Sequence, residues 1–77
     1  MLTLDKTEKN TLYRVVEIKS DEAVKKRLSE LGLIEGTLIS RILTAPSGDP
    51  SAYLIRGAQI ALRNEHAKGV TVEYAET

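Results

Sequence analysis

The sequence predicts a mainly β domain: a small antiparallel barrel of about five strands, with one helix inserted after the first long strand. Three observations support this fold class. Short runs rich in β-branched and aromatic residues recur along the chain. Turn-forming residues separate these runs at close spacing, and a single segment carries the apolar spacing of a helix. With 77 residues, the chain is expected to form one domain over residues 1–77.

The first long strand is expected at residues 12–18, which are rich in residue types that favour β structure. Tyr13 and Val15 would face the same side of this strand, because side chains alternate along a strand. Ile18 reaches that side only if a bulge near Val16 shifts the alternation by one residue. The sequence therefore predicts a bulged strand at this point.

The one helix is expected at residues 20–31. Ser20 or Asp21 can cap its N-terminus, and Gly32 stands where a left-handed residue would end it. The basic run at residues 25–27 is interpreted as a solvated helix face, because neighbouring acids offset its charge. The apolar side of the helix is a narrow stripe made of Val24, Leu28 and Leu31.

An apolar corner follows the helix, where Leu33 and Ile34 occupy a connection that would normally be polar. Such a corner is either buried beneath another element or available to a partner. Leu28, Leu31 and Leu33 are interpreted as mainly structural residues that tie the helix to the barrel. Ile34 is kept as a candidate partner contact.

A hairpin is expected around the loop at residues 46–51, which is dense in turn formers. If this loop closes evenly, Leu43 lies opposite Leu54, and Arg41 lies opposite Arg56. Strand alternation then gives an inward face of Ile42, Thr44, Tyr53 and Ile55, and an outward face of Arg41, Leu43, Ala45, Ala52, Leu54 and Arg56. A slip of one residue would exchange the two faces.

The remaining segments complete the expected barrel. Strands are predicted at residues 36–45, 52–57, 59–63 and 69–74, with a single capped turn at residues 64–67. Residues 1–11 are expected to form a polar lead-in, and residues 75–77 a tail. Short strands, close turns and one inserted helix are typical of a small SH3-like barrel.

Composition argues against several classes of function. Eleven basic and eleven acidic residues give a net charge of zero, so no overall field favours nucleic acid or an anionic membrane. The chain has no Phe or Trp, which leaves few aromatic platforms for base stacking. No apolar run approaches the ~18 residues of a spanning helix, and the first residues lack a signal-peptide pattern. We therefore expect no nucleic-acid partner and no direct membrane insertion.

No catalytic or metal-binding constellation is present in the sequence. His66 is the only histidine and the chain has no Cys, so ligands for a transition metal are scarce. No nucleophile elbow accompanies His66. The loop at residues 46–50 has one glycine and carries Asp49, whereas a phosphate-binding loop needs two glycines and a lysine. We expect no enzyme activity, no metal site and no cofactor.

Three blocks of the sequence together resemble the FeoA family, small bacterial proteins of ferrous iron uptake. The blocks are RLSELGLIEG at residues 27–36, APSGDP at residues 45–50 and GAQIALR at residues 57–63. They follow the family patterns RL-x-x-LGL-x-x-G, AP-x-GDP and G-x-x-[IV]-ALR in that order, and the resemblance covers residues 12–73. The departures are mild, namely Lys9-Asn10 for a frequent Pro-Gly, Glu35 for a frequent Pro, and Ser47 for a common apolar residue.

The resemblance implies an SH3-like fold and a cytoplasmic accessory role beside FeoB, the membrane ferrous iron transporter with a cytoplasmic G-protein domain. The family has no agreed enzymatic activity or metal ligands, so the resemblance carries none over to this chain. The expected partner is a FeoB-type transporter, with weak homo-oligomerisation in addition. The alternatives are an SH3-like peptide- or metal-binding regulatory domain of a metal-responsive system, and a structural homo-oligomer. The candidate partner-binding residues are Ile34, Arg41, Leu43, Tyr53, Leu54 and Arg56.

Overall fold

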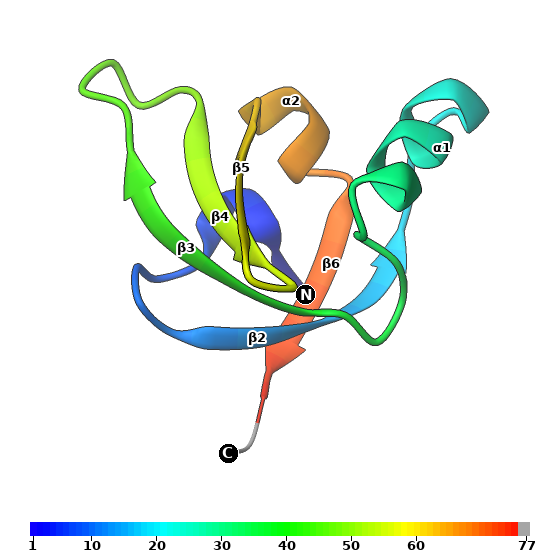
Figure 1. Ribbon diagram of the computed structural model, residues 1–77, viewed down its shortest axis with the longest axis horizontal. Coiled ribbons are helices and arrows are strands. Elements are labelled where there is room, and N and C mark those ends of the chain that lie inside the picture. The colour runs from blue at the N-terminus through cyan, green and yellow to red at the C-terminus, as the bar shows by residue number, and fades with distance from the viewer. Residues whose placement is uncertain (76–77) are drawn as a thin grey trace.

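The chain folds as a bent antiparallel sheet with a helix at one side (Figure 1). The computed structural model describes residues 1–75. Its elements in chain order are β1 (Leu2–Thr3), the 3-10 helix η1 (Leu4–Lys6), β2 (Leu12–Ile18), α1 (Glu22–Glu30), β3 (Leu38–Thr44), β4 (Ser51–Ile55), β5 (Ala58–Leu62), α2 (Asn64–Ala67) and β6 (Val70–Tyr74). The strands join in the order β1-β6-β2-β3-β4-β5, and all pairs of named strands are antiparallel.

The concave side of the sheet encloses the core. The buried cluster consists of Leu4, Tyr13, Val15, Ile18, Leu28, Leu33, Ile39, Tyr53, Ile55, Leu62, Ala67, Val70 and Val72. A mainly β fold with its one long helix after the first long strand is therefore confirmed. The sheet has six strands because the two-residue β1 pairs with β6. No helix within residues 1–75 is long and apolar enough to cross a membrane.

Strand β2 contains the predicted bulge. Val15 pairs with Val72 and Glu17 pairs with Thr71, so the register shifts between these pairs. The shift leaves Val16 exposed and turns Ile18 back into the core. The apolar spacing of this strand was sufficient to predict the bulge, because only a shifted alternation buries Ile18.

The predicted register of the β3–β4 hairpin is wrong. Leu43 pairs with Ala52 instead of Leu54, and Leu54 pairs with Ser40. The register shifts between Arg41 and Leu43, which makes Ile42 the bulged residue of β3. On the loop side of the bulge, Thr44 pairs with Ser51, so the strands already pair two residues away from the predicted register. The bulge shifts the pairs beyond it by one more residue, which turns Arg41 from the predicted outward side to the inward side.

The inward face predicted for this hairpin is therefore only half correct. Tyr53 and Ile55 are buried as expected, with 0% and 1% of their surface exposed. Ile42 is half-buried at the bulge, and Thr44 is exposed near the loop. Arg56 does not face Arg41, because it lies in the turn after β4.

The first residues of the chain contribute more than a polar lead-in. Leu4 is fully buried in the core, and the neighbouring β1 extends the sheet at β6. The Leu4 carbonyl oxygen accepts a hydrogen bond from the Thr7 hydroxyl at 2.8 Å and another from the Tyr53 hydroxyl at 3.4 Å. Residues 1–7 thus close one end of the core. Of the predicted tail at residues 75–77, residues 76–77 lie outside the described residues.

Helix α1 begins and ends at the predicted signals. The Asp21 side chain accepts a hydrogen bond from the Val24 amide at 2.9 Å, which caps the N-terminus. At the C-terminus, Gly32 adopts a φ of 93°. The amide of Leu33 donates to the Leu28 carbonyl at 2.9 Å, and the amide of Gly32 donates to the Ser29 carbonyl at 2.9 Å. These two bonds form a Schellman motif, which directs Leu33 into the core.

The tip of the β3–β4 hairpin is fastened to α2. The Asp49 side chain accepts a hydrogen bond from the Asn64 amide at 3.0 Å, at the first residue of α2. The Asn64 side-chain amide donates to the Gly48 carbonyl at 3.0 Å. The Asp49 carboxylate also lies 3.8 Å from the Arg63 guanidinium. Asp49 therefore has a structural role as a cap contributed by a distant loop.

Candidate functional site

Three leucines form an exposed face on the outside of the hairpin. Leu54 lies opposite Ser40 and Leu43 lies opposite Ala52, so Leu43 and Leu54 share the outer side although they are not paired. Leu38 precedes Ser40 by two residues and shares that side. Their exposed fractions are similar, at 43% for Leu38, 46% for Leu43 and 45% for Leu54. We call Leu38, Leu43 and Leu54 the leucine face. The outward position predicted for Leu43 and Leu54 is correct, although their predicted pairing is not.

Two of the predicted partner contacts belong to the interior and are withdrawn. Tyr53 has no exposed surface, because its ring lies in the core. Arg41 is half-buried, and its guanidinium donates to the carbonyl oxygens of Leu4 at 3.2 Å and Asp5 at 2.7 Å. Both side chains hold the N-terminal segment against the sheet. Of the other candidates outside the leucine face, Ile34 and Arg56 are exposed and stay available to a partner.

The environment of Tyr53 combines burial with a nearby charge. The Arg41 guanidinium carbon lies 6.0 Å from the centre of the Tyr53 ring. Burial raises the pKa of the Tyr53 phenol above its usual value of 10.0, and the Arg41 charge opposes part of that rise. The phenol therefore stays protonated at neutral pH and serves as a donor to the Leu4 carbonyl.

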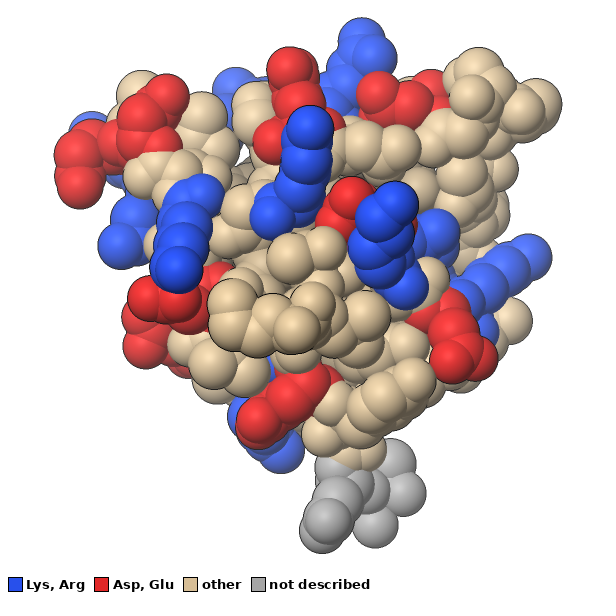
Figure 2. Space-filling model, turned by 180° about the vertical axis from the view of Figure 1, so that it is seen from behind, with Lys and Arg blue, Asp and Glu red and all other residues tan. Residues whose placement is uncertain are grey.

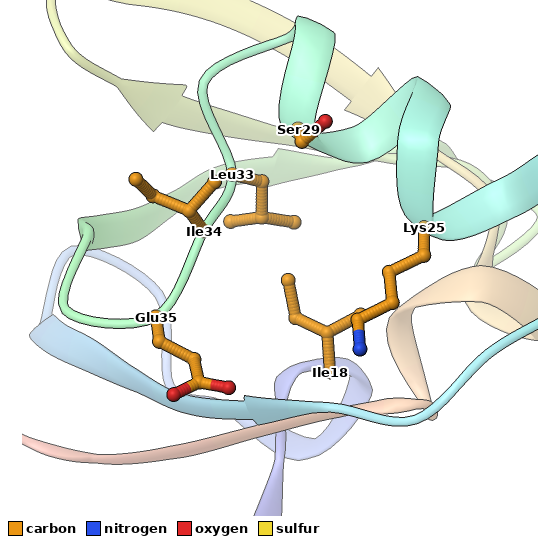
Figure 3. A pocket seen from close by; sticks show the side chains of 6 residues that line it. All are labelled: Ile18, Lys25, Ser29, Leu33, Ile34 and Glu35. Atoms are coloured by element: carbon orange, nitrogen blue, oxygen red, sulfur yellow. The ribbon is translucent and has the colours of Figure 1, made fainter. Parts of the chain in front are cut away.

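A pocket lies beside Ile34, between α1 and the corner that follows it (Figure 3). Its volume is about 320 Å³, and its lining residues are Ile18, Lys25, Ser29, Leu33, Ile34 and Glu35. Figure 3 shows Ile18 and Leu33 facing one space, with Ile34 on the corner beside it and the charged ends of Lys25 and Glu35 at its margin. We call it the corner pocket. An apolar floor with one charge of each sign suits an apolar side chain of a partner rather than chemistry on a substrate.

A second hollow lies on the other side of α1, facing β5. Its volume is about 300 Å³, and we call it the α1–β5 groove. It is lined by Val24, Arg27, Leu28, Leu31, Ala61, Leu62, Arg63 and His66. This groove was not predicted from the sequence, because its two walls are formed by segments that are far apart in the chain. Leu31, which follows the last residue of α1 and was expected to tie the helix to the barrel, is 36% exposed and lines this groove. Nothing in the sequence near Leu31 indicates this.

The surface charges are mixed in sign. Figure 2 shows acidic and basic side chains interspersed over one face, with uncharged surface between them. This pattern agrees with the net charge of zero and gives no broad field for nucleic acid. Among residues 1–75, no group of three or more His, Cys, Asp or Glu side chains could hold a metal ion.

Comparison with known proteins gives the family and the fold. The FeoA domain family matches residues 2–74. A fusion protein of Porphyromonas gingivalis, which joins Fe(2+) transport protein A to the Fe(2+) transporter FeoB, is 32% identical over 59 residues. That match covers 77% of this chain and 7% of the fusion protein.

Two solved structures share the fold. The FeoA protein from Chlorobium tepidum is 28% identical with a TM-score of 0.91, and the match covers 97% of this chain and 71% of that one. The FeoA of Stenotrophomonas maltophilia, complexed with zinc and described as a prokaryotic SH3 domain protein, is 27% identical with a TM-score of 0.82. The match covers 95% of this chain and 91% of the Stenotrophomonas maltophilia chain. The predicted SH3-like fold is therefore confirmed, and the chain belongs to the FeoA domain family, which is involved in ferrous iron transport.

Proposed function

We propose that this protein is a cytoplasmic, non-catalytic binding module that docks on the G-protein domain of a FeoB-type ferrous iron transporter. The observation that carries the proposal is the Porphyromonas gingivalis fusion, in which a segment similar to this chain shares one polypeptide with such a transporter. Domains fused in one protein are held at high effective concentration, which is useful when they contact each other. The pockets of this protein offer apolar floors and no reactive pair of side chains.

The proposed docking surface is the leucine face. Three leucines with similar exposure on one side of two adjacent strands form more apolar surface than scattered single residues would. Ile34, on the corner after α1, is 44% exposed and lies outside the leucine face. So small a domain offers a modest interface, so the binding is expected to be weak and reversible.

Substitution of the leucine face tests the proposal. Leu43→Asp and Leu54→Asp are each expected to weaken binding to the purified G-protein domain by about tenfold or more, measured by calorimetry. A leucine side chain buried in an interface contributes about 1.5–3 kcal/mol to the free energy of binding. A change of about 1.4 kcal/mol corresponds to a tenfold change in Kd. Val16→Asp is the matched control, because Val16 is 44% exposed at the bulge of β2, outside the hairpin.

The Val16→Asp control shows whether a loss of binding is specific to the leucine face. Val16→Asp is expected to bind as the wild type does. Folded Leu43→Asp and Leu54→Asp proteins that also bind with wild-type affinity would remove the leucine face from the interface. A wild-type protein that shows no binding to the G-protein domain would contradict the docking proposal itself.

A structural homo-oligomer is the second candidate, because the same leucines could pair between two copies. An interface of this kind would make the molecular mass depend on concentration. Light scattering over a wide concentration range separates the two candidates. A constant monomer mass would exclude self-pairing, whereas a dimer lost in Leu54→Asp would support it.

A further inference from the structure

Strand β5 has an edge without a partner strand. It pairs with β4 over five consecutive residue pairs, and no strand within residues 1–75 pairs with its other edge. Proteins commonly protect such edges with charged residues, proline, a bulge or a very short strand. The strand at the opposite end of the sheet, β1, has two residues. Strand β5 has five, Ala-Gln-Ile-Ala-Leu, with no charge, no proline and no break in register.

The α1–β5 groove runs beside this free edge. In Figure 1, β5 lies between β4 and the side of the molecule that carries α1. Two residues at the end of β5 line the groove, followed by Arg63. Three residues of α1 and the residue at its C-cap, Leu31, line it from the other side. The apolar part of the groove is made by Val24, Leu28, Leu31, Ala61 and Leu62.

The charged groups of the groove have one sign. Its charged residues are Arg27 and Arg63, and no acidic residue lines it. Arg63 lies 3.8 Å from Asp49 with 64% of its side chain exposed, which is a weak surface pair. Neither the Arg27 side chain nor the His66 side chain makes a hydrogen bond or an ion pair within the described part of the chain. A basic rim in a protein of zero net charge favours an acidic ligand.

The groove is continuous with the leucine face. Ala52 pairs with Leu43 on β3 and with Ala61 on β5, so one row of side chains crosses from the leucine face to the groove. Ala61 is exposed and lines the groove. A single partner can therefore cover both surfaces.

We propose that an extended segment of the partner, carrying apolar and acidic side chains, adds to the free edge of β5 and lies in the α1–β5 groove. Its backbone forms hydrogen bonds to β5, its apolar side chains contact Leu31 and Ala61, and its carboxylates face Arg27 and Arg63. This inference rests on the proposed docking to the transporter G-protein domain. It adds the mode of recognition and the chemistry of the recognised segment.

The first test is a charge reversal with a matched control. Arg27→Glu is expected to weaken binding of the purified G-protein domain by about tenfold. Lys26→Glu makes the same change of charge on the adjacent exposed residue of α1, outside the groove. It is expected to stay within about twofold of the wild type. Because the proposed contacts are ionic, the difference between the two variants should shrink as salt is added.

The second test uses the wild-type protein and needs no substitution. Amide groups alternate between the two edges of an antiparallel strand, so only alternate β5 amides point to the free edge. Those amides are expected to exchange with solvent more slowly once the G-protein domain is bound, as measured by hydrogen exchange with NMR detection. Amides of β1, the other edge of the sheet, serve as the internal control.

The outcomes separate this inference from the proposed function. Weaker binding of Arg27→Glu together with slowed exchange at alternate β5 amides supports strand addition in the groove. Binding that is unchanged in Arg27→Glu, or unchanged exchange at β5, overturns the inference while the docking proposal stands. Absence of any binding by the wild type overturns both.

Discussion

Arg56 and Gly57 form the two-residue turn between β4 and β5, with φ angles of 50° and 81°. Positive φ at both turn positions is the type I′ geometry, which favours Asn-Gly over most other pairs. An arginine in this conformation carries a steric cost of about 1 kcal/mol that asparagine largely avoids. Arg56→Asn is therefore expected to raise the melting temperature by about 4–8 °C. Arg14→Asn, at an exposed position of β2, is the control and should not raise the melting temperature. A lower melting temperature for Arg56→Asn would contradict the proposed strain in the turn.

Tyr53 predicts how stability changes in alkali. Burial raises the pKa of its phenol, whereas the unfolded phenol titrates near its usual pKa of 10.0. Above that pH the folded state retains a proton that the unfolded state has lost, so stability is full below about pH 10 and falls above it. Urea unfolding at about pH 8 and about pH 10.5 should show this fall, and Tyr53→Phe should reduce it.

A control is needed because Tyr74 titrates in the same direction. Its pKa is also raised, by its neighbours Tyr13 and Glu8, and its side chain is exposed. Tyr74→Phe should therefore leave most of the pH dependence in place. If the free energy of unfolding falls equally in the wild type and in Tyr53→Phe between about pH 8 and about pH 10.5, the buried phenol does not control alkaline stability.

At the scale of elements, Arg41 joins η1 to β3. Its guanidinium donates to the carbonyl oxygens of Leu4 and Asp5 in η1. The Leu4 carbonyl also accepts from the Thr7 amide that ends η1, so Arg41 adds bonds from a distant strand to this short helix. Arg41→Met keeps the apolar stem and removes these bonds, at an expected cost of about 1–3 kcal/mol in the free energy of unfolding. Urea denaturation measures the loss. Arg14→Met, on the exposed side of β2, should change it by less than about 0.5 kcal/mol. Equal effects of the two substitutions would contradict the proposed role of Arg41.

Elements with a local signal could be predicted from the sequence. The helix has a capping residue at Asp21 and a stop at Gly32, and both act as expected. The bulge in β2 follows from the spacing of Val15 and Ile18, because both must reach the same core. Each of these features depends on residues that are close together in the chain.

Elements that depend on distant contacts could not be predicted in the same way. The bulge at Ile42 places Arg41 beside the N-terminal segment, and nothing near Ile42 in the sequence indicates this. The same limit applies to Leu4, whose burial depends on Tyr53 and the end of the sheet. Of the candidate site, the exposure of Leu43 and Leu54 was predictable from alternation. The α1–β5 groove was not, because it exists only where two distant segments meet.

The whole molecule combines a small core with three exposed leucines on one side of the β3–β4 hairpin and an apolar groove beside β5. The leucine face, the row through Ala52 and the α1–β5 groove adjoin one another across β3, β4 and β5. Acidic and basic side chains are interspersed over the face shown in Figure 2, and the net charge is zero, which limits nonspecific attraction. If the protein docks as proposed, its partner is expected to contact one continuous side of the sheet.

An NMR titration of the isotope-labelled protein with the G-protein domain of the FeoB-type transporter tests this central claim most directly. Docking across the leucine face and the α1–β5 groove should cause saturable chemical-shift changes at backbone amides of β3, β4 and β5 and on the groove side of α1. Amides of β1 and of the β2 bulge at Val16 should be unaffected. Spectra that stay unchanged at an excess of the G-protein domain, or shifts confined to β1 and the β2 bulge, would contradict it.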